Sequence, residues 1–124
     1  DSNGILDGDG NVLMAMGTLA MIAAAAPKNL VHVTIDNGVY ESTGNQKTLS
    51  SKIELQKVAQ SSGYKSSLIV NELDALKRGL RNALNSQGPS FILVKVEPSF
   101  DQNTYRVTYK PQEIKRRFMI AASS

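Results

Sequence analysis

Residues 30–35, with the sequence LVHVTI, are apolar and rich in β-branched side chains almost without interruption. A strand with one face in water alternates polar and apolar side chains, whereas a nearly continuous apolar run indicates a strand covered on both faces. Residues 91–96 (FILVKV) repeat this pattern, and residues 68–70 repeat it in shorter form. The runs predict a parallel sheet. His32, the only histidine, lies inside the first run and is expected to be a core residue with a hydrogen-bond partner rather than an acid–base catalyst.

Segments of helical length separate the predicted strands. Residues 12–26 (VLMAMGTLAMIAAAA) are apolar on almost every side and end before Pro27. They are shorter than the about 20 residues that span a bilayer, so we expect a helix that is buried within the fold. Its three methionines are then expected to fill the core. These are Met14, Met16 and Met21.

Further helices are predicted later in the chain. Ser51 and Glu54 have the spacing of a capping box, which indicates a helix over residues 51–61. Leucines at three-to-four spacing predict a second helix over residues 71–84, and Pro111 could begin a third. Strands that alternate with helices predict an α/β domain with a doubly wound, mainly parallel sheet and helices on both faces.

The composition excludes several classes of protein. The chain has 124 residues, which is about the size of one domain. Its net charge of +3 is too small to indicate a nucleic-acid-binding protein or a polybasic membrane surface. The sequence has no cysteine, which excludes disulfides and thiolate chemistry. We therefore expect a domain of a cytoplasmic protein that binds neither nucleic acid nor membrane.

Two polar turns follow predicted strands. Gly8-Asp9-Gly10 follows a short apolar run and opens the first helix, and Asn37 follows the LVHVTI strand. Because the carboxyl ends of parallel strands meet at one edge of a sheet, both turns should lie together. N–H groups at a helix start attract a phosphate, while an aspartate there repels it unless a divalent cation lies between them. The pattern therefore predicts a metal–diphosphate site. Asp9 and Asn37 would give oxygen ligands to Mg²⁺, and the N–H groups of Gly10 and Asn11 would donate to the diphosphate.

A calcium-binding loop is an alternative interpretation of the first turn. Asp7, Asp9 and Asn11 occupy alternate positions, as in an EF-hand. That loop also requires glycine at its sixth position and glutamate at its twelfth, where this chain has Val12 and Thr18. The calcium interpretation therefore fails.

The two turns are also where the chain resembles a known family. Gly8-Asp9-Gly10, an interval of 26 residues (11–36) and then Asn37 resemble the motif of thiamine diphosphate enzymes. The surrounding sequence, from about residue 5 to about residue 50, resembles the phosphonopyruvate and sulfopyruvate decarboxylases in particular. The resemblance implies that the backbone carbonyl of Val39 is a third metal ligand. It also implies a set of cofactor-binding residues, namely Gly8, Asp9, Gly10, Asn11, Asn37, Val39 and Tyr40.

The resemblance further implies an activity. In such enzymes thiamine diphosphate and Mg²⁺ support the non-oxidative decarboxylation of a 2-oxoacid, and we expect phosphonopyruvate to be converted to phosphonoacetaldehyde. Two alternatives stay open: a beta-type subunit of sulfopyruvate decarboxylase, and a non-catalytic domain that binds a diphosphate ligand. Residues 40–46 would form a loop over the cofactor, and within it Thr43, Gly44 and Gln46 are candidate substrate contacts.

Residues 1–124 are expected to form the diphosphate- and metal-binding (PP) domain of a larger enzyme, as a C-terminal fragment without the first elements of its fold. By resemblance, the glutamate that activates the cofactor belongs to a pyrimidine-binding domain, and nothing in this sequence matches that domain. The catalytic residue is therefore expected outside this chain, which should be inactive by itself. The partner would be upstream sequence or a separate subunit of a homo- or hetero-oligomer.

Overall fold

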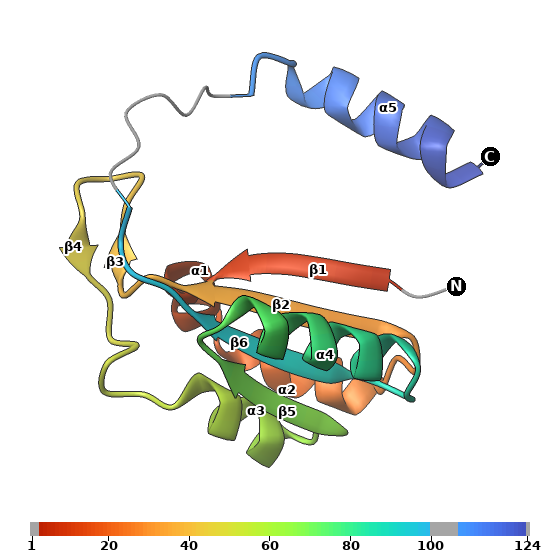
Figure 1. The fold of residues 1–124 in the computed structure, drawn as a ribbon. Helices are drawn as coiled ribbons and strands as arrows, with labels where there is room; N and C mark the ends of the chain where they lie inside the picture. The colour runs from red at the N-terminus through yellow and green to blue at the C-terminus, as the bar shows by residue number, and fades with distance from the viewer. Residues whose placement is uncertain (1–2, 100–106, 124) are drawn as a thin grey trace.

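The computed structural model describes residues 3–99 and 107–123. Its main sheet has four parallel strands in the order β1-β2-β6-β5 (Figure 1). The strands are β1 (Asn3–Gly8), β2 (Leu30–Asp36), β5 (Ser66–Val70) and β6 (Ser90–Lys95). A separate antiparallel hairpin follows β2 and consists of β3 (Val39–Tyr40) and β4 (Gln46–Lys47). The parallel sheet that the apolar runs predict is confirmed.

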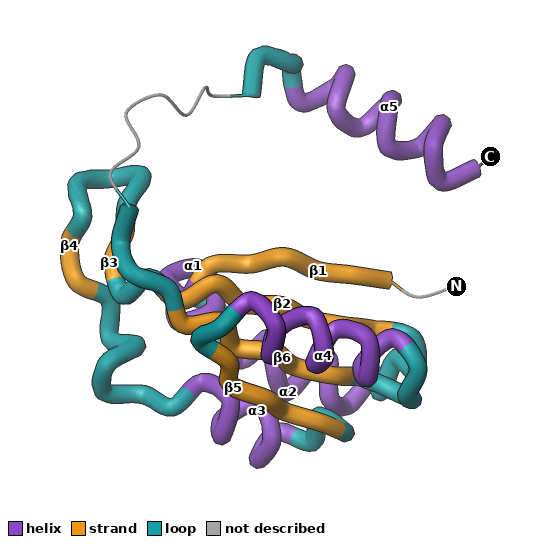
Figure 2. The backbone as a smooth tube through the Cα atoms, viewed as in Figure 1, coloured by secondary structure: helices purple, strands orange, loops and turns teal. Residues whose placement is uncertain are grey.

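Helices lie on both faces of this sheet, as Figure 2 shows. One face packs against α1 (Asp9–Met14), α2 (Gly17–Ala25) and α3 (Leu55–Ser62). The opposite face packs against α4 (Leu73–Leu84). A last helix, α5 (Pro111–Ser123), follows the strands in the chain, and none of its described side chains is buried. The doubly wound α/β fold is therefore confirmed.

Strand β6 shows why the chain needs unbroken apolar runs. Phe91 and Leu93 belong to the core on the α1–α3 side, together with Leu19 of α2. The alternate residues Ile92 and Val94 belong to the core on the α4 side. Full burial of such a side chain stabilises the fold by about 1.5–3 kcal/mol. Because both faces are covered, the successive residues 91–94 of the strand are all apolar.

Residues 12–26 do not form the single buried helix that their composition predicts. The segment is divided between α1 and α2, with a break at residues 15–16. Met14 is 73% exposed, Met21 72% and Met16 37%, so the prediction that these methionines fill the core is wrong. Each short helix contacts the sheet along one side only, through residues such as Leu19. An apolar composition shows that burial of these side chains would be favourable, but it does not show whether another part of the fold covers them.

The capping box is also not formed. Helix α3 begins at Leu55 with Glu54 before it, rather than at Ser51. The backbone N–H of Ile53 donates to the carbonyl oxygen of Leu49 at 3.1 Å, so the preceding residues form a turn. A turn satisfies these N–H groups as well as a cap would, and sequence spacing alone does not distinguish the two.

His32 is a core residue, as predicted, and is 4% exposed. Its Nδ1 lies 3.0 Å from the hydroxyl oxygen of Tyr64, and its ring packs edge-on against Phe91 at 5.1 Å between centroids. Its Nε2 faces Oδ2 of Asp7 at 3.6 Å, and within residues 3–99 and 107–123 this nitrogen has no acceptor at hydrogen-bond distance. Burial lowers the pKa of His32 below 6.5, while the charge of Asp7 acts in the opposite direction.

We predict that the folded protein loses stability as the pH falls below about 6.5, because the unfolded chain then binds a proton that buried His32 resists. One proton limits the slope to about 1.4 kcal/mol per pH unit. Burial raises the pKa of Tyr64 to about 12, so that group keeps its proton throughout. Chemical denaturation between pH 7.5 and 5 measures the slope, which should flatten in His32→Gln. An equal slope in the variant would contradict the assignment to His32.

The first turn of α1 packs against β3 through a glycine. A Cβ atom on Gly10 would lie only 2.4 Å from Cε1 and 2.7 Å from Cδ1 of the Tyr40 ring. A Cβ on Gly8 would meet nothing within 4 Å, and the backbone of Gly8 is extended, with φ −106°. The absence of a side chain at residue 10 is therefore required by a protein contact, whereas residue 8 borders open space.

We predict that Gly10→Ala destabilises the fold by about 1–3 kcal/mol, because Tyr40 must move out of its packed position. Gly8→Ala is the matched control and should change the free energy of unfolding by less than about 0.5 kcal/mol. Denaturant melts of Gly10→Ala, Tyr40→Leu and the double variant form a double-mutant cycle. Purely additive losses would show that the two residues do not clash.

Candidate functional site

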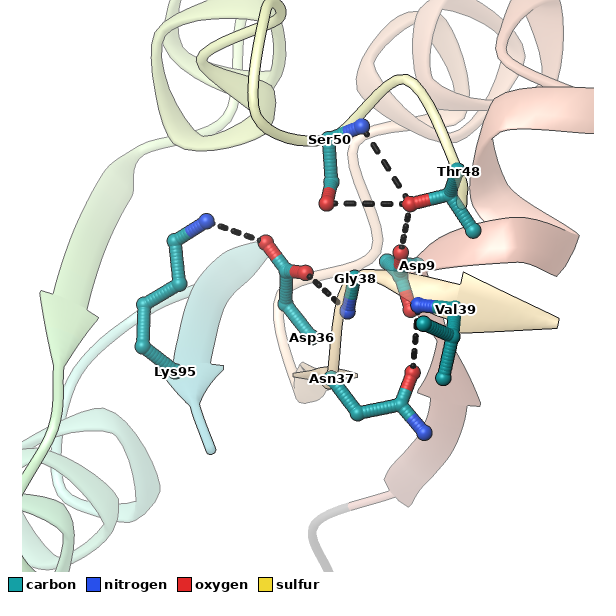
Figure 3. A network of polar contacts seen from close by, with 8 residues as sticks. All are labelled: Asp9, Asp36, Asn37, Gly38, Val39, Thr48, Ser50 and Lys95. Carbon is teal, nitrogen blue, oxygen red and sulfur yellow. Dashed lines mark hydrogen bonds and ion pairs between the residues drawn. The ribbon is translucent and has the colours of Figure 1, made fainter. Parts of the chain in front are cut away.

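Both polar turns lie at the carboxyl edge of the sheet, as their positions in the sequence predict. Gly8 ends β1 and pairs with Ile35 near the end of β2. Asp9 follows β1 directly and begins α1. The second strand, β2, ends at Asp36 and is followed by Asn37. Figure 3 shows the polar contacts that each turn makes.

Asp9 is a buried carboxylate, with 2% of its surface exposed. Its Oδ2 accepts a hydrogen bond from the Thr48 hydroxyl at 2.5 Å. Within residues 3–99 and 107–123, no lysine, arginine or histidine forms an ion pair with it. An unpaired charge away from water is strongly unfavourable, so such a carboxylate favours a bound cation.

Asp36 is the second buried acid at this edge, and it is already neutralised. Its side chain is 2% exposed, and Oδ2 lies 2.5 Å from Nζ of Lys95 on β6. Its Oδ1 accepts the N–H of Gly38 at 3.1 Å, which fixes the turn that follows β2. The two acids therefore differ in one respect: Asp36 has a protein cation and Asp9 has none in the described part of the chain.

The Asn37 side chain is held within its own loop. Its Oδ1 accepts the N–H of Val39 at 3.1 Å, and its Nδ2 donates to Oε2 of Glu41 at 3.0 Å. Gly38 has φ +71°, a conformation that residues with a side chain rarely adopt. An amide oxygen has two lone pairs, so Oδ1 can accept the Val39 N–H and still bind a metal ion.

Helix α1 has only six residues, but its first turn offers backbone N–H groups to a ligand. At the first turn of α1 the N–H groups of Gly10 and Asn11 have no acceptor within the helix. The side chain of Asn11 points back to Asp7, to which its Nδ2 donates at 2.7 Å. Any contact of Asn11 with a diphosphate would therefore use its backbone.

A pocket of about 700 Å³ opens beyond the carboxyl ends of β2, β5 and β6. Asn37 and Lys95 line it, and Asp9 does not. The remaining lining residues are Asp36, Gly38, Ser50, Ser51, Asn71, Val96, Glu97 and Pro98. Most residues around the pocket are polar or charged, and the pocket lies next to the Asn37 loop.

Two of the candidate substrate contacts, Thr43 and Gly44, lie in the turn between β3 and β4, and the third, Gln46, begins β4. Thr43 Oγ1 donates to Oε1 of Gln46 at 3.1 Å, and Gln46 Nε2 donates to the carbonyl oxygen of Thr43 at 3.4 Å. Gly44 has φ +133°, which permits the turn between them. All three are exposed. Their described contacts keep the turn in shape, and their contact with a substrate stays a prediction.

The protein supplies few metal ligands by itself. The described residues contain no cluster of three or more histidine, cysteine, aspartate or glutamate side chains that could hold an ion. Asp9, the Asn37 amide and the Val39 carbonyl would therefore need oxygen atoms from a ligand to complete the sphere of Mg²⁺, which prefers six. This donor set fits a metal that is shared with a diphosphate.

Sequence reasoning missed Thr48, Ser50 and Lys95. Thr48 and Ser50 follow the hairpin as ordinary hydroxyl residues, and Lys95 ends an apolar strand. Their positions become meaningful only when β4 returns the chain to Asp9 and when β6 lies beside β2. The alternation in β6 could have placed Lys95 at the carboxyl edge, but no sequence signal specified its partner.

The described helices include none that is both long enough and apolar enough to cross a membrane. This agrees with the prediction from the length of residues 12–26.

Comparison with known proteins identifies the family of this domain. The sequence signature of the C-terminal TPP-binding domain of thiamine pyrophosphate enzymes covers residues 5–94. Phosphonopyruvate decarboxylase of Streptomyces viridochromogenes is 43% identical over 114 residues, which are 92% of this chain and 29% of that protein. Sulfopyruvate decarboxylase subunit beta of Methanococcus maripaludis is 40% identical over 116 residues, which are 94% of this chain and 62% of that protein.

A solved structure shows the same fold. It belongs to a protein from Mycobacterium smegmatis that is proposed to be a thiamin diphosphate-dependent enzyme. The TM-score is 0.66 at 21% identity, over 79% of this chain and 18% of that one. The chain thus spans less than two thirds of the length of each of these relatives. It belongs to the thiamine pyrophosphate enzyme family, of which it contains the C-terminal TPP-binding domain.

Proposed function

We propose that the protein containing this domain is a thiamine diphosphate- and Mg²⁺-dependent enzyme for the non-oxidative decarboxylation of a 2-oxoacid, with phosphonopyruvate as substrate and phosphonoacetaldehyde as product. The observation that carries the proposal is Asp9, a buried carboxylate without a protein cation among the described residues, beside a loop whose amide faces a polar pocket. The 43% identity to a phosphonopyruvate decarboxylase supports the choice of reaction.

In this proposal the chain holds the metal and the diphosphate half of the cofactor. Asp9, the Asn37 side-chain oxygen and the Val39 carbonyl bind Mg²⁺, while the N–H groups of Gly10 and Asn11 donate to the diphosphate. The open space beside Gly8 leaves room for the ligand. Tyr40 packs against Gly10 and supports the turn that carries these groups.

When bound, thiamine diphosphate supplies the electron sink for the carbanion that decarboxylation leaves. The residues of this domain orient the cofactor by its charged end and neutralise the diphosphate through Mg²⁺. We assign the activating glutamate to a pyrimidine-binding partner, either part of a longer chain or a separate subunit in an oligomer. Both arrangements have support, because one relative is called a subunit beta and another is a longer protein.

The identity of the acidic group on the substrate is the finer part of the proposal. Phosphonopyruvate and sulfopyruvate both present a compact anion, which N–H groups and cations can bind. Thr43, Gly44 and Gln46 at the tip of the β3–β4 hairpin, with Lys47 beside them, are the proposed contacts. A sulfopyruvate decarboxylase is the second candidate, since the identity to the beta subunit is 40%.

A non-catalytic diphosphate-binding domain is the candidate from a different class. Such a domain would bind Mg²⁺ with any diphosphate ligand, without preference for thiamine. We predict instead that the complete protein binds thiamine diphosphate in a Mg²⁺-dependent manner and that Asp9→Ala weakens binding by more than about 100-fold, because the carboxylate ligand is lost. Calorimetric titration measures this. Asp74→Ala, which changes an exposed acid on α4, is the matched control.

Unchanged affinity in the Asp9→Ala variant would remove the metal role of that residue. Equal affinity for thiamine diphosphate and for ADP, with no turnover, would favour the non-catalytic alternative.

We predict that kcat/KM for phosphonopyruvate exceeds that for sulfopyruvate by at least about tenfold, a preference worth about 1.4 kcal/mol. Gln46→Ala should lower kcat/KM by a similar factor, because it removes both the proposed contact and the bond to Thr43. Gln60→Ala on the exposed surface of α3 is the control. Steady-state aldehyde formation gives both values. A reversed ratio would assign the sulfonate substrate.

A further inference from the structure

One residue connects both halves of the metal site. The Thr48 hydroxyl donates to Oδ2 of Asp9 at 2.5 Å, and the Thr48 backbone N–H donates to the carbonyl oxygen of Gly38 at 2.9 Å. Gly38 lies between the two proposed ligands of the second turn, Asn37 and Val39. Thr48 is buried and comes directly after β4 (Figure 3). It therefore fixes the carboxylate of the first turn relative to the loop of the second.

The orientation of the Thr48 hydroxyl is determined by its partners. A hydroxyl has one proton and two lone pairs, and a carboxylate can only accept, so the Thr48 proton goes to Asp9. The lone pairs then accept from the N–H of Ser50 at 3.3 Å and from the Ser50 hydroxyl, whose oxygen lies 3.0 Å away. Every hydrogen-bonding position of Thr48 Oγ1 is used, and the side chain has one orientation.

This arrangement makes the two oxygens of Asp9 unequal. Oδ2 accepts the Thr48 proton and keeps one lone pair, whereas Thr48 leaves both lone pairs of Oδ1 free, so Oδ1 is the oxygen that is better able to bind a cation. A neutral hydroxyl also adds no positive charge beside the carboxylate. A lysine in the same place would neutralise it, as Lys95 does for Asp36 at 2.5 Å.

We propose that Thr48 is a positioning residue for the metal, which holds Asp9 in one rotamer with its free oxygen directed towards the ion and keeps the Asn37–Val39 loop beside it. The inference rests on the proposed metal role of Asp9. Ser50 acts behind Thr48 and fixes the direction of its hydroxyl proton.

The test uses the complete protein with its pyrimidine-binding partner and Mn²⁺ as the probe, with and without thiamine diphosphate. Electron paramagnetic resonance of unbound Mn²⁺ gives the dissociation constant, and a thermal melt of each variant in the absence of metal gives its stability. We expect Thr48→Val, which keeps the shape and removes the hydroxyl, to weaken Mn²⁺ binding by about 10- to 100-fold. Thr48→Ser, which restores the hydroxyl, should stay within about threefold of the unchanged protein.

Thr18→Val is the matched control, because it makes the same change at an exposed threonine of α2 that has no proposed role, and it should leave the dissociation constant unchanged. If Thr48→Val fails to fold, Ser50→Ala serves as the second variant. It removes one hydrogen bond to Thr48 Oγ1 and should weaken Mn²⁺ binding by about three- to tenfold, with a smaller effect on the melt.

The outcomes separate the two proposals. If the unchanged protein binds Mn²⁺ and Thr48→Val binds it equally well, the positioning role is wrong while the metal site stands. The positioning role is also wrong if Ser50→Ala, used in place of Thr48→Val, binds Mn²⁺ as tightly as the unchanged protein. Absence of Mn²⁺ binding by the unchanged protein with thiamine diphosphate present would overturn the metal site, and the role of Thr48 with it.

Discussion

The parallel pairing of β1 with β2 is the constraint on which the site depends. The pairing of Gly8 with Ile35 brings the ends of both strands to one edge, although 26 residues separate the two sequence motifs. A shift by one residue would reverse which face each side chain occupies. Residues 3–6 of β1 are exposed, so the side chains of β1 do little to fix this register. Val12 of α1, the helix that follows β1, is buried in the core and holds the end of β1 at this edge of the sheet.

The two buried aspartates at this edge have different neighbours. Two aspartates are buried there, and β6 supplies a lysine to Asp36 alone. Asp36 is bound by Lys95 and by the Gly38 N–H, which hold the turn after β2, whereas the described partner of Asp9 is the neutral hydroxyl of Thr48. In the proposed function, the acid that holds the fold and the acid that binds the metal are therefore different residues at the same edge of the sheet.

The architecture could be predicted from the sequence, because the apolar runs of the strands and the leucine spacing of the helices reflect which side chains face the core. Asp9 and Asn37 could also be placed, since the ends of parallel strands share an edge. Composition did not predict that Met14 and Met21 are exposed, because it carries no information about which sides of a helix other elements cover. It also failed for Thr48, whose role depends on the conformation of a hairpin that returns the chain to Asp9.

The bond between Thr48 and Asp9 has a consequence for how the domain folds. It joins residues 39 apart and encloses α1, α2, β2 and the hairpin. Closing a segment of that length carries an entropic cost that only later contacts offset, so pairs distant in sequence form slowly. Asp9 cannot acquire its final environment until β2 has docked and the hairpin has returned. The surroundings of Asp9 are therefore complete only once residues 9–48 have folded together, whereas the Asp36–Lys95 pair at the same edge spans 59 residues and waits for β6 as well.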